Sequence, residues 1–153
     1  MKVKDDLVIY YSYDLNWHLP EGIQNDAKEF LSQVSMEQLP LIFQTYAKEC
    51  WENAVDVVVS VGYPKNELAL PKLYELFMDI NWPGALKALE YLKGIDHSVN
   101  VKHLKNACAK AVEENDTEWL YFLYIVSEDL NINQNDFENV SLYNQMKKVY
   151  EEE

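Results

Sequence analysis

Residues 68–92 read LALPKLYELFMDINWPGALKALEYL, and this stretch decides the fold. In its first half, apolar residues recur at the spacing of one helix face: Leu73, Leu76, Phe77 and Ile80. Pro83 has no backbone N–H to donate, so we expect it in the first turn of a second helix. Leucines then recur at every third position: Leu86, Leu89 and Leu92. Two apolar-faced helices joined by a short connection predict an antiparallel helical hairpin.

Helical periodicity extends on both sides of this hairpin. Gly62 followed by Pro64 is typical of a helix end, because glycine takes the left-handed backbone conformation and proline cannot continue the helix. Residues 35–38 (SMEQ) fit a capping box, and Asn115 with Glu118 fits another. We therefore expect helical hairpins in series, followed by a terminal helix; the hairpins cover 41–61, 67–93 and 98–127.

Stacked helix pairs of this size predict an all-α fold, a short α-solenoid of antiparallel helical hairpins with HEAT-like character. A chain of 153 residues is expected to form a single domain, 1–153. Within it we expect an N-terminal extension (1–40), a HEAT-like helical core (41–130) and a C-terminal helix (131–153).

Two segments are ambiguous between helix and strand. Residues 7–13 (LVIYYSY) are β-branched and aromatic, which favours a short extended N-terminal segment within residues 1–17. A lone strand needs a partner, and the comparable run is 55–61 (VDVVVSV). Either the two runs pair, or tertiary packing makes one or both helical. The helix end at Gly62 favours a helix for the second run.

The chain is strongly acidic, with 26 Asp and Glu residues against 13 basic ones, all of them lysine, and a net charge of −13. This charge argues against binding nucleic acid, because a phosphate backbone needs lysine and arginine to displace its counterions. It favours a basic protein partner, since opposite fields speed encounter and help to select partners. An acidic surface that serves solubility alone is the other interpretation.

Cysteine usage and hydropathy indicate a cytoplasmic protein. Cys50 and Cys108 form neither a disulfide framework nor a CxxC motif, so we expect buried free thiols in a reducing compartment. The N-terminus becomes acidic too early for a secretory signal, and no apolar run approaches the ~20 residues that span a bilayer. We therefore expect no membrane association.

Five segments share the motifs of one protein family: Trp51-Glu52-Asn53-Ala54, Gly62-Tyr63-Pro64, Leu70-Pro71-Lys72-Leu73, Asp79-Ile80-Asn81-Trp82-Pro83-Gly84-Ala85 and Asp116-Thr117-Glu118-Trp119-Leu120. Through them, residues 41–130 resemble an uncharacterised bacterial domain of unknown function with a HEAT-like helical shape. The hallmark of that family is Asp-x-Asn-Trp-Pro-x-Ala, which residues 79–85 match. The resemblance implies an α-helical fold and no established reaction, so it carries no catalytic residue onto this chain.

The residues give no sign of a catalytic, metal or cofactor site. His18, His97 and His103 are not spaced as zinc ligands, either with each other or with a cysteine. Nucleotide-binding and nucleophile-elbow motifs are absent from the sequence, so we expect no cofactor and no small-molecule ligand. His103 and Cys108 are conceivable as base and nucleophile, but a small buried residue on a core helix face explains Cys108 better.

Two sets of residues are candidates for partner binding. The first, the acidic tip, would pair with lysine or arginine of a partner; it consists of Glu113, Glu114, Asp116 and Glu118. The second, the aromatic set, would supply binding hot spots; it consists of Tyr10, Tyr11, Tyr13 and Trp17. The structural interpretations are helix capping at a solvated turn for the tip and core packing for some of the aromatic residues.

A structural role is also expected for the family motif. Asp79 or Asn81 would satisfy free N–H groups at the start of the next helix. Trp82 would pack between helices with its indole N–H bonded.

Three functions fit these observations. The first is a bacterial immunity protein that neutralises a basic toxin, such as a nuclease, through an acidic surface. The second is a general HEAT-like interaction or regulatory module with no toxin partner, and genome context separates it from the first. The third is an enzyme, such as a hydrolase that uses carboxylates, which requires convergent residues with shifted pKa values in a pocket. We expect the first, a non-enzymatic protein-binding role.

Overall fold

The computed structural model describes residues 2–153, and the regular structure in this range is entirely helical. The α-helices are α1 (Asp5–Tyr13), α2 (Glu21–Leu31), α3 (Lys48–Val61), α4 (Leu70–Glu75), α5 (Ala85–Leu92), α6 (His97–Glu113), α7 (Thr117–Asp129) and α8 (Val140–Glu152). Short 3₁₀ segments separate some of them: η1 (Leu39–Ile42), η2 (Glu67–Ala69), η3 (Leu76–Met78) and η4 (Gln134–Asp136). The predicted all-α class is confirmed.

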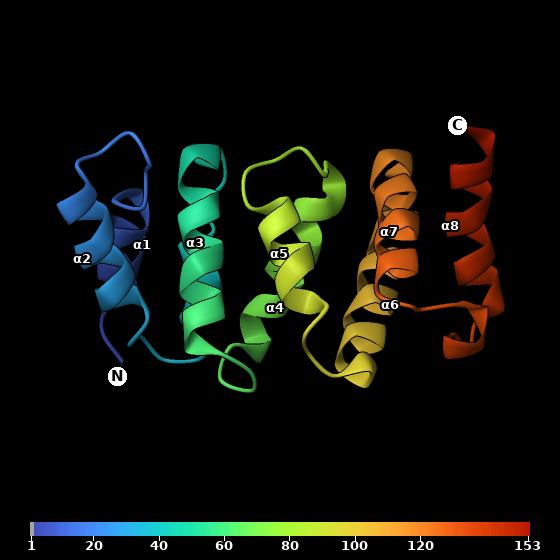
Figure 1. Cartoon of the computed structure of the whole chain (residues 1–153), viewed down its shortest axis with the longest axis horizontal. Coiled ribbons are helices and arrows are strands. Elements are labelled where there is room, and N and C mark those ends of the chain that lie inside the picture. Colours follow the sequence, from blue (N-terminus) through green and yellow to red (C-terminus); the bar gives the residue numbers. More distant parts are fainter. Residues whose placement is uncertain (1) are drawn as a thin grey trace.

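The helices stand side by side in a row that follows the order of the chain, with α1 and α2 at one end and α8 at the other (Figure 1). The loop 14–20, the start of α3, the loop 79–84 and the turn 114–116 lie along one edge of this row, which we call the upper edge. The loops 62–66, 93–96 and 130–139 lie along the opposite edge.

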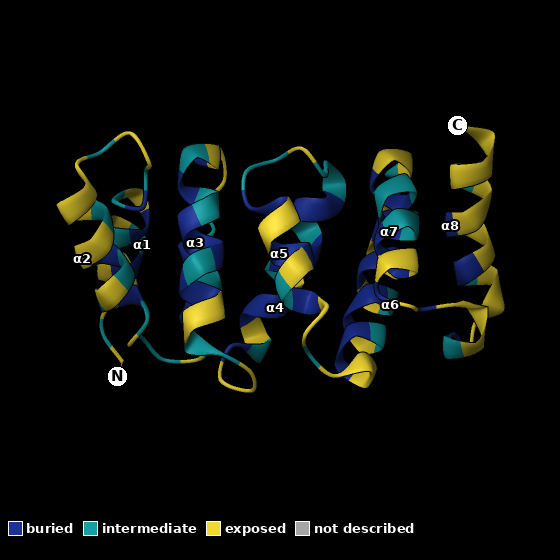
Figure 2. Cartoon of the chain, viewed as in Figure 1, coloured by how far each residue is buried: buried dark blue, intermediate teal, exposed yellow. Residues whose placement is uncertain are grey.

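One hydrophobic core runs through the whole row. It includes Val8 of α1, Leu31 of α2 and Val58 of α3, and it continues to Leu123 of α7 and Met146 of α8. Buried residues lie on the sides of the helices that face their neighbours, and exposed residues cover the outer faces (Figure 2). The segment expected as an N-terminal extension is therefore a helix pair that packs on α3.

Residues 5–13 form helix α1, so of the two alternatives left open for this segment the helix is the one observed, and the extended segment is absent. The described residues contain no strand with which it could pair, and tertiary packing overrides local β propensity. Val8 and Ser12, one turn apart, are buried against the rest of the core. The side-chain amide of Gln38 donates hydrogen bonds to the backbone carbonyl of Val3 and to Asp5 Oδ1, which fix the start of the helix.

The valine run 55–61 belongs to helix α3, as the stop at Gly62 indicated. Val55, Val57 and Val58 are fully buried, and Gly62 ends the helix with a positive φ of 78°. The regular helix begins at Lys48 and not near residue 41. Pro40 lies in the 3₁₀ segment η1, and an irregular segment, 43–47, separates η1 from α3.

The central hairpin is present, but the connection between its two helical arms begins earlier and ends later than the apolar periodicity predicted. The first arm ends at Met78, so Ile80 lies outside the helix, and the second arm begins only at Ala85. Pro83 therefore precedes helix α5 and does not enter its first turn. Leu86 is 67% exposed, because the buried face of α5 is built from other residues: Ala85, Ala88, Leu89 and Leu92.

A chain of buried hydrogen bonds joins four helices. The indole Nε1–H of Trp119 in α7 donates to the backbone carbonyl of Tyr74 in α4 at 3.0 Å. The Tyr74 hydroxyl donates to Asn100 Oδ1 in α6 at 2.8 Å, and Asn100 Nδ2 donates to the carbonyl of Leu92 in α5 at 2.7 Å. Buried polar groups that find partners specify how helices pack, so Trp119 has a structural role.

Two predicted caps differ in detail. Asp116, and not Asn115, caps α7: its Oδ1 accepts the Trp119 N–H at 3.0 Å. Asn115 instead turns the chain with a positive φ of 55°. In the segment 35–38, the Ser35 hydroxyl donates to Gln38 Oε1 at 3.1 Å, where we had expected it to accept the Gln38 N–H. The first segment lies between α2 and η1, and the second precedes and opens α7.

Candidate functional site

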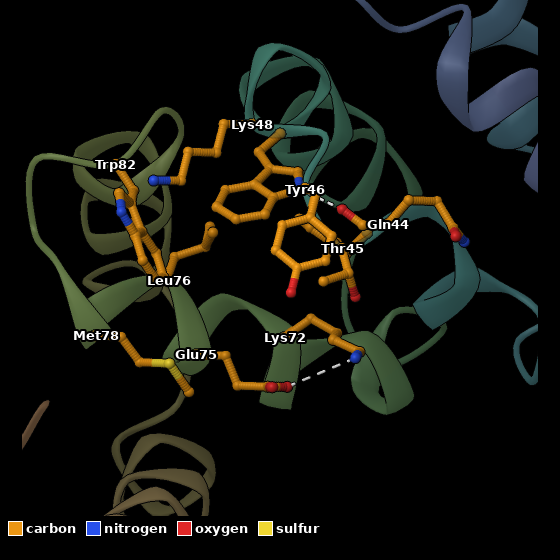
Figure 3. A pocket seen from close by; sticks show the side chains of 11 residues that line it. Gln44, Thr45, Tyr46, Lys48, Lys72, Glu75, Leu76, Met78 and Trp82 are labelled. Atoms are coloured by element: carbon orange, nitrogen blue, oxygen red, sulfur yellow. Dashed lines mark hydrogen bonds and ion pairs between the residues drawn. The ribbon is translucent and has the colours of Figure 1, made fainter. Parts of the chain in front are cut away.

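A cleft with a volume of about 410 Å³ opens where the segment 43–47 and the start of α3 face α4 and η3. Its walls are largely apolar, and the side chains that form them are Phe43, Tyr46, Trp51, Leu76, Met78 and Trp82 (Figure 3). Concave, mostly apolar spaces of this size with a few polar groups are typical of ligand-binding and anchor-binding sites. The cleft therefore has the size and lining expected of a binding site, and it is the main candidate site.

Two tryptophans form the aromatic wall of the cleft. The rings of Trp51 and Trp82 lie 5.4 Å apart between centroids, with an interplanar angle of 65°. Trp51 is held by a hydrogen bond from its Nε1–H to the carbonyl of Gln44 at 2.9 Å. Edge-to-face pairs of this kind are favoured by the ring quadrupoles. Trp82 packs in this form, half-buried at the surface of the cleft, but the hydrogen bond expected from its indole N–H has no acceptor within residues 2–153.

Gly84 brings Trp82 against helix α3. Its φ is 88°, and a Cβ at this position would lie 2.9 Å from Val55 Cγ2 and 3.1 Å from the Trp51 carbonyl oxygen. The backbone of the loop thus approaches the backbone of α3 more closely than any other residue allows. The glycine of the family-like motif is therefore required at the cleft.

Asp79 shapes the same loop, in a different way from the one predicted. Its Oδ1 accepts the backbone N–H of Asn81 at 2.9 Å, and its carbonyl accepts that of Trp82 at 2.9 Å. This is an Asx turn, which reverses the chain locally. The N-cap of α5 is Gly84, which carries no side chain, so the expected cap by Asp79 or Asn81 is wrong.

The charged groups at the cleft are mainly cationic. Lys48 extends toward Trp82, with its Nζ 5.0 Å from the ring centroid, while Lys72 approaches from the opposite side (Figure 3). Glu75 is shared by two lysines, Lys72 at 3.7 Å and Lys110 at 3.9 Å. Lys48 forms no ion pair with any residue in the range 2–153. In a chain of net charge −13, the cleft is a local site of positive charge.

Tyr46, at the rim of the cleft, has an unfavourable backbone conformation. Its φ is 63°, in the left-handed region that a bulky side chain rarely adopts. Its side chain is 94% exposed, so packing of the ring does not explain the conformation. Backbone strain of this kind is concentrated at functional sites, which supports the choice of this cleft.

The structure places the acidic tip at the turn between α6 and α7. Glu113 ends α6, Glu114 follows it, and Glu118 lies in the first turn of α7, all three exposed. None of these three carboxylates forms an ion pair with a residue in the described part of the chain. Asp116 is different, because it is half-buried and caps α7.

The aromatic set divides between surface and core. Tyr10 is 63% exposed, Tyr13 48% and Trp17 43%, which makes them available to a partner. Tyr11 is half-buried and stacks on Phe30 of α2, with ring centroids 4.3 Å apart. Tyr11 therefore joins α1 to α2.

Both candidate sets border the upper edge, and the cleft lies between them. The loop that carries Trp17 is joined to the start of α3 by a hydrogen bond from the Trp17 N–H to the Glu49 carbonyl at 3.1 Å. Lys48, which directly precedes Glu49 in the chain, lines the cleft. On the other side, the ion pair of Glu75 with Lys110 connects the cleft to α6, one turn before the acidic tip. The structure thus brings the sets to one edge without direct contact between them.

The cysteines and histidines form no reactive arrangement in the described residues. Burial raises the pKa of the Cys108 thiol to about 12, and burial with the nearby Glu49 and Asp14 raises that of Cys50 to about 11. Both thiols therefore stay protonated and unreactive at neutral pH. No group of three or more His, Cys, Asp or Glu side chains within residues 2–153 could hold a metal ion. None of the helices described has the length and apolarity to cross a membrane.

Sequence reasoning missed the cleft, although it named some of its residues. Trp51 and Trp82 both stand in motifs, yet they are far apart in the sequence and meet only in the folded chain. The sequence shows two tryptophans in separate motifs, the second of which also contains Gly84. This pattern does not predict a concave surface.

Comparison with known proteins gives no relative: no protein-family model, no curated protein and no solved structure matches this chain. The resemblance to an uncharacterised HEAT-like family therefore stays a prediction.

Proposed function

We propose that this chain is a non-enzymatic, protein-binding immunity protein that neutralises a basic toxin domain, such as a nuclease. The observation that carries the proposal is the acidic tip: Glu113, Glu114 and Glu118 are exposed and unpaired within the described residues. Unpaired carboxylates on a chain of net charge −13 create a negative field that accelerates encounter with a basic surface.

The exposed aromatic side chains add the second part of a docking surface. Tyr10, Tyr13 and Trp17 are large, amphipathic and solvent-accessible, which is the composition of interface hot spots. Charge at one end of the upper edge would orient the partner, and aromatic contacts at the other end would hold it. A cytoplasmic location, expected from the sequence, is where a cell needs protection from its own toxin.

The test is functional linkage to the product of the adjacent gene. Deletion of this gene is expected to stop growth of cells that carry the neighbouring gene, and the two purified products are expected to form a stable complex. If the neighbour encodes no toxin and deletion has no effect on growth, the immunity role is refuted. Binding of a non-toxic neighbour in the same assay would instead identify a general interaction module.

Two triple variants with equal charge change test the surface. E113Q/E114Q/E118Q removes the free carboxylates of the tip, whereas the control E21Q/D26N/E29Q removes three exposed carboxylates of α2. Both lower the net negative charge by three, from −13 to −10. The tip variant is expected to lose protection while the α2 variant retains it. Equal loss in both variants would show that overall charge alone drives binding.

A further inference from the structure

The cleft has the chemistry of a site for a small organic ligand. Its volume of about 410 Å³ falls within the range of small-molecule pockets, about 300–1,000 Å³, and aromatic and aliphatic side chains form most of its walls. The sequence contains no cofactor motif, from which we expected no small-molecule ligand. An aromatic cleft formed by segments that are distant in sequence can bind a small molecule without such a motif.

The charges at the cleft determine which kind of ligand fits. A cation would meet Lys48 and Lys72, and the nearby Glu75 is already shared between Lys72 and Lys110. An anion would instead meet Lys48, whose ammonium group lies over the Trp82 ring and has no carboxylate partner among residues 2–153. Charge complementarity therefore favours an anionic group.

The shape and composition of the walls determine the rest of the ligand. Trp51 and Trp82 present an edge-to-face aromatic surface, and Leu76 and Met78 supply flexible apolar contacts on the η3 side (Figure 3). A planar aromatic body packs well on such walls. Tyr46, strained and exposed at the rim, is positioned to cover one side of that body.

We propose that this cleft binds a small aromatic carboxylate. The planar body packs against Trp51 and Trp82, and the carboxylate accepts a charge-assisted hydrogen bond from Lys48, which leaves the Trp82 ring to reach it. Lys72, on the opposite side of the cleft, is paired with Glu75, so Lys48 supplies the unpaired positive charge. This site is independent of the proposed immunity role, which rests on the acidic tip and the aromatic set.

The test compares three probes of nearly equal shape by isothermal titration calorimetry on the full chain. The probes are 2-naphthoate, the neutral 2-naphthamide and the cationic 2-naphthylmethylammonium. We expect 2-naphthoate to bind with one-to-one stoichiometry and at least tenfold more tightly than 2-naphthamide, a difference of about 1.4 kcal/mol. The cation is expected to bind more weakly than the amide. Equal affinity for the three probes, or no binding of 2-naphthoate at millimolar concentration, would overturn the proposal.

Two lysine variants with the same charge change locate the anionic group. Lys48→Gln is expected to weaken 2-naphthoate at least fivefold and to leave 2-naphthamide unchanged. Lys65→Gln, an exposed lysine in the loop 62–66 on the opposite edge, is expected to change neither. Both lysines are exposed, so both variants should fold. A Lys48→Gln protein that retains the wild-type preference for the anion would contradict the assigned position.

Nuclear magnetic resonance gives an independent readout of the aromatic wall. The chain has four indole N–H signals, from Trp17, Trp51, Trp82 and Trp119. Addition of 2-naphthoate is expected to shift the signals of Trp51 and Trp82 and to leave that of Trp119, which is buried against Tyr74, in place. Shifts confined to Trp17 would place the ligand outside the cleft and refute the proposal.

Discussion

Gly84 is the residue on which the geometry of the central corner depends. The alanine variant would place a Cβ 3.1 Å from a backbone oxygen of α3, an atom that cannot rotate away, and would hold alanine at a positive φ. Left-handed backbone and overpacking together predict that G84A lowers the free energy of unfolding by about 2–4 kcal/mol.

Urea denaturation measures the effect of G84A. Gly22, in α2, is the matched control, because a Cβ there meets nothing within 4 Å and its backbone is helical. G22A is expected to raise stability slightly, since alanine is the better helix former. Equal stability of G84A and the wild type would show that loop 79–84 does not pack closely on α3.

We expect the left-handed backbone conformation of Tyr46 to lower the free energy of unfolding of the chain. The left-handed conformation costs a residue with a Cβ about 1–2 kcal/mol, while the greater freedom of glycine in the unfolded chain costs about 0.4–1 kcal/mol. Because the ring is 94% exposed, Y46G loses little packing and should be more stable than the wild type by up to about 1.6 kcal/mol.

The same change should weaken the binding of 2-naphthoate, whereas Y46F retains the ring and should bind normally. Thermal unfolding and calorimetry on the three proteins check both expectations. A Y46G protein that is markedly less stable would show that the tyrosine is structural.

At the level of elements, Asp56 joins three helices. Its two oxygens pair with Lys87 of α5 at 2.7 Å and with Lys28 of α2 at 3.1 Å, while Asp56 itself lies in α3. Burial alone would raise the pKa of Asp56, but hydrogen bonds and charge from the two lysines outweigh it and lower the pKa. Its contribution to stability is therefore present above the ordinary value of 3.8 and lost as the pH falls through the lower, folded value.

These pairs are about one-third exposed, so solvent screens them, and D56N should cost only about 1 kcal/mol at low salt and less at high salt. The control D26N changes an exposed carboxylate on α2 and should have no effect on urea denaturation. If the free energy of unfolding lost in D56N does not change with salt, Asp56 acts through packing and not through charge.

The contact of α6 with η2 and α4 should depend on pH through His103. This side chain is 6% exposed, stacks on Tyr74 and lies 3.5 Å from Glu67. Burial, followed by the charge of Lys102, lowers the pKa of His103 below 6.5, although Glu67 acts in the opposite direction. The unfolded chain then binds a proton more readily than the folded one, so stability is full above pH 6.5 and falls as the pH falls below it.

Urea denaturation of the wild type and H103Q between pH 8 and pH 5 isolates this contribution. The difference in free energy of unfolding, wild type minus variant, is expected to decrease toward acid pH. A difference that increases would mean that Glu67 stabilises the imidazolium form and reverses the sign.

The helices that follow residue 48 were largely predictable from sequence, but their ends, their contacts and the helical state of residues 5–13 were not. Periodicity identified α6 and α7 because their apolar faces are long and regular. Residues 5–13 could not be assigned from sequence, because their β-branched and aromatic side chains favour a strand locally. Packing against α2, such as Tyr11 on Phe30, makes them helical instead. The cleft could not be predicted from sequence, because Trp51 and Trp82 meet only through the close approach of Gly84 to α3.

At the scale of the whole molecule, we propose that the acidic tip of this strongly negative chain captures a basic partner. Charges outside the core of an interface act mainly on the association rate and its dependence on salt. We therefore propose to measure the association rate constant with the proposed partner, the product of the adjacent gene, at low and at high ionic strength.

We predict that E113Q/E114Q/E118Q slows association about tenfold at low salt, and that high salt removes most of this difference. The charge-matched α2 variant E21Q/D26N/E29Q should remain close to the wild type. If the two variants slow association equally, or if neither does, the tip is not the docking site and the proposed immunity function is refuted.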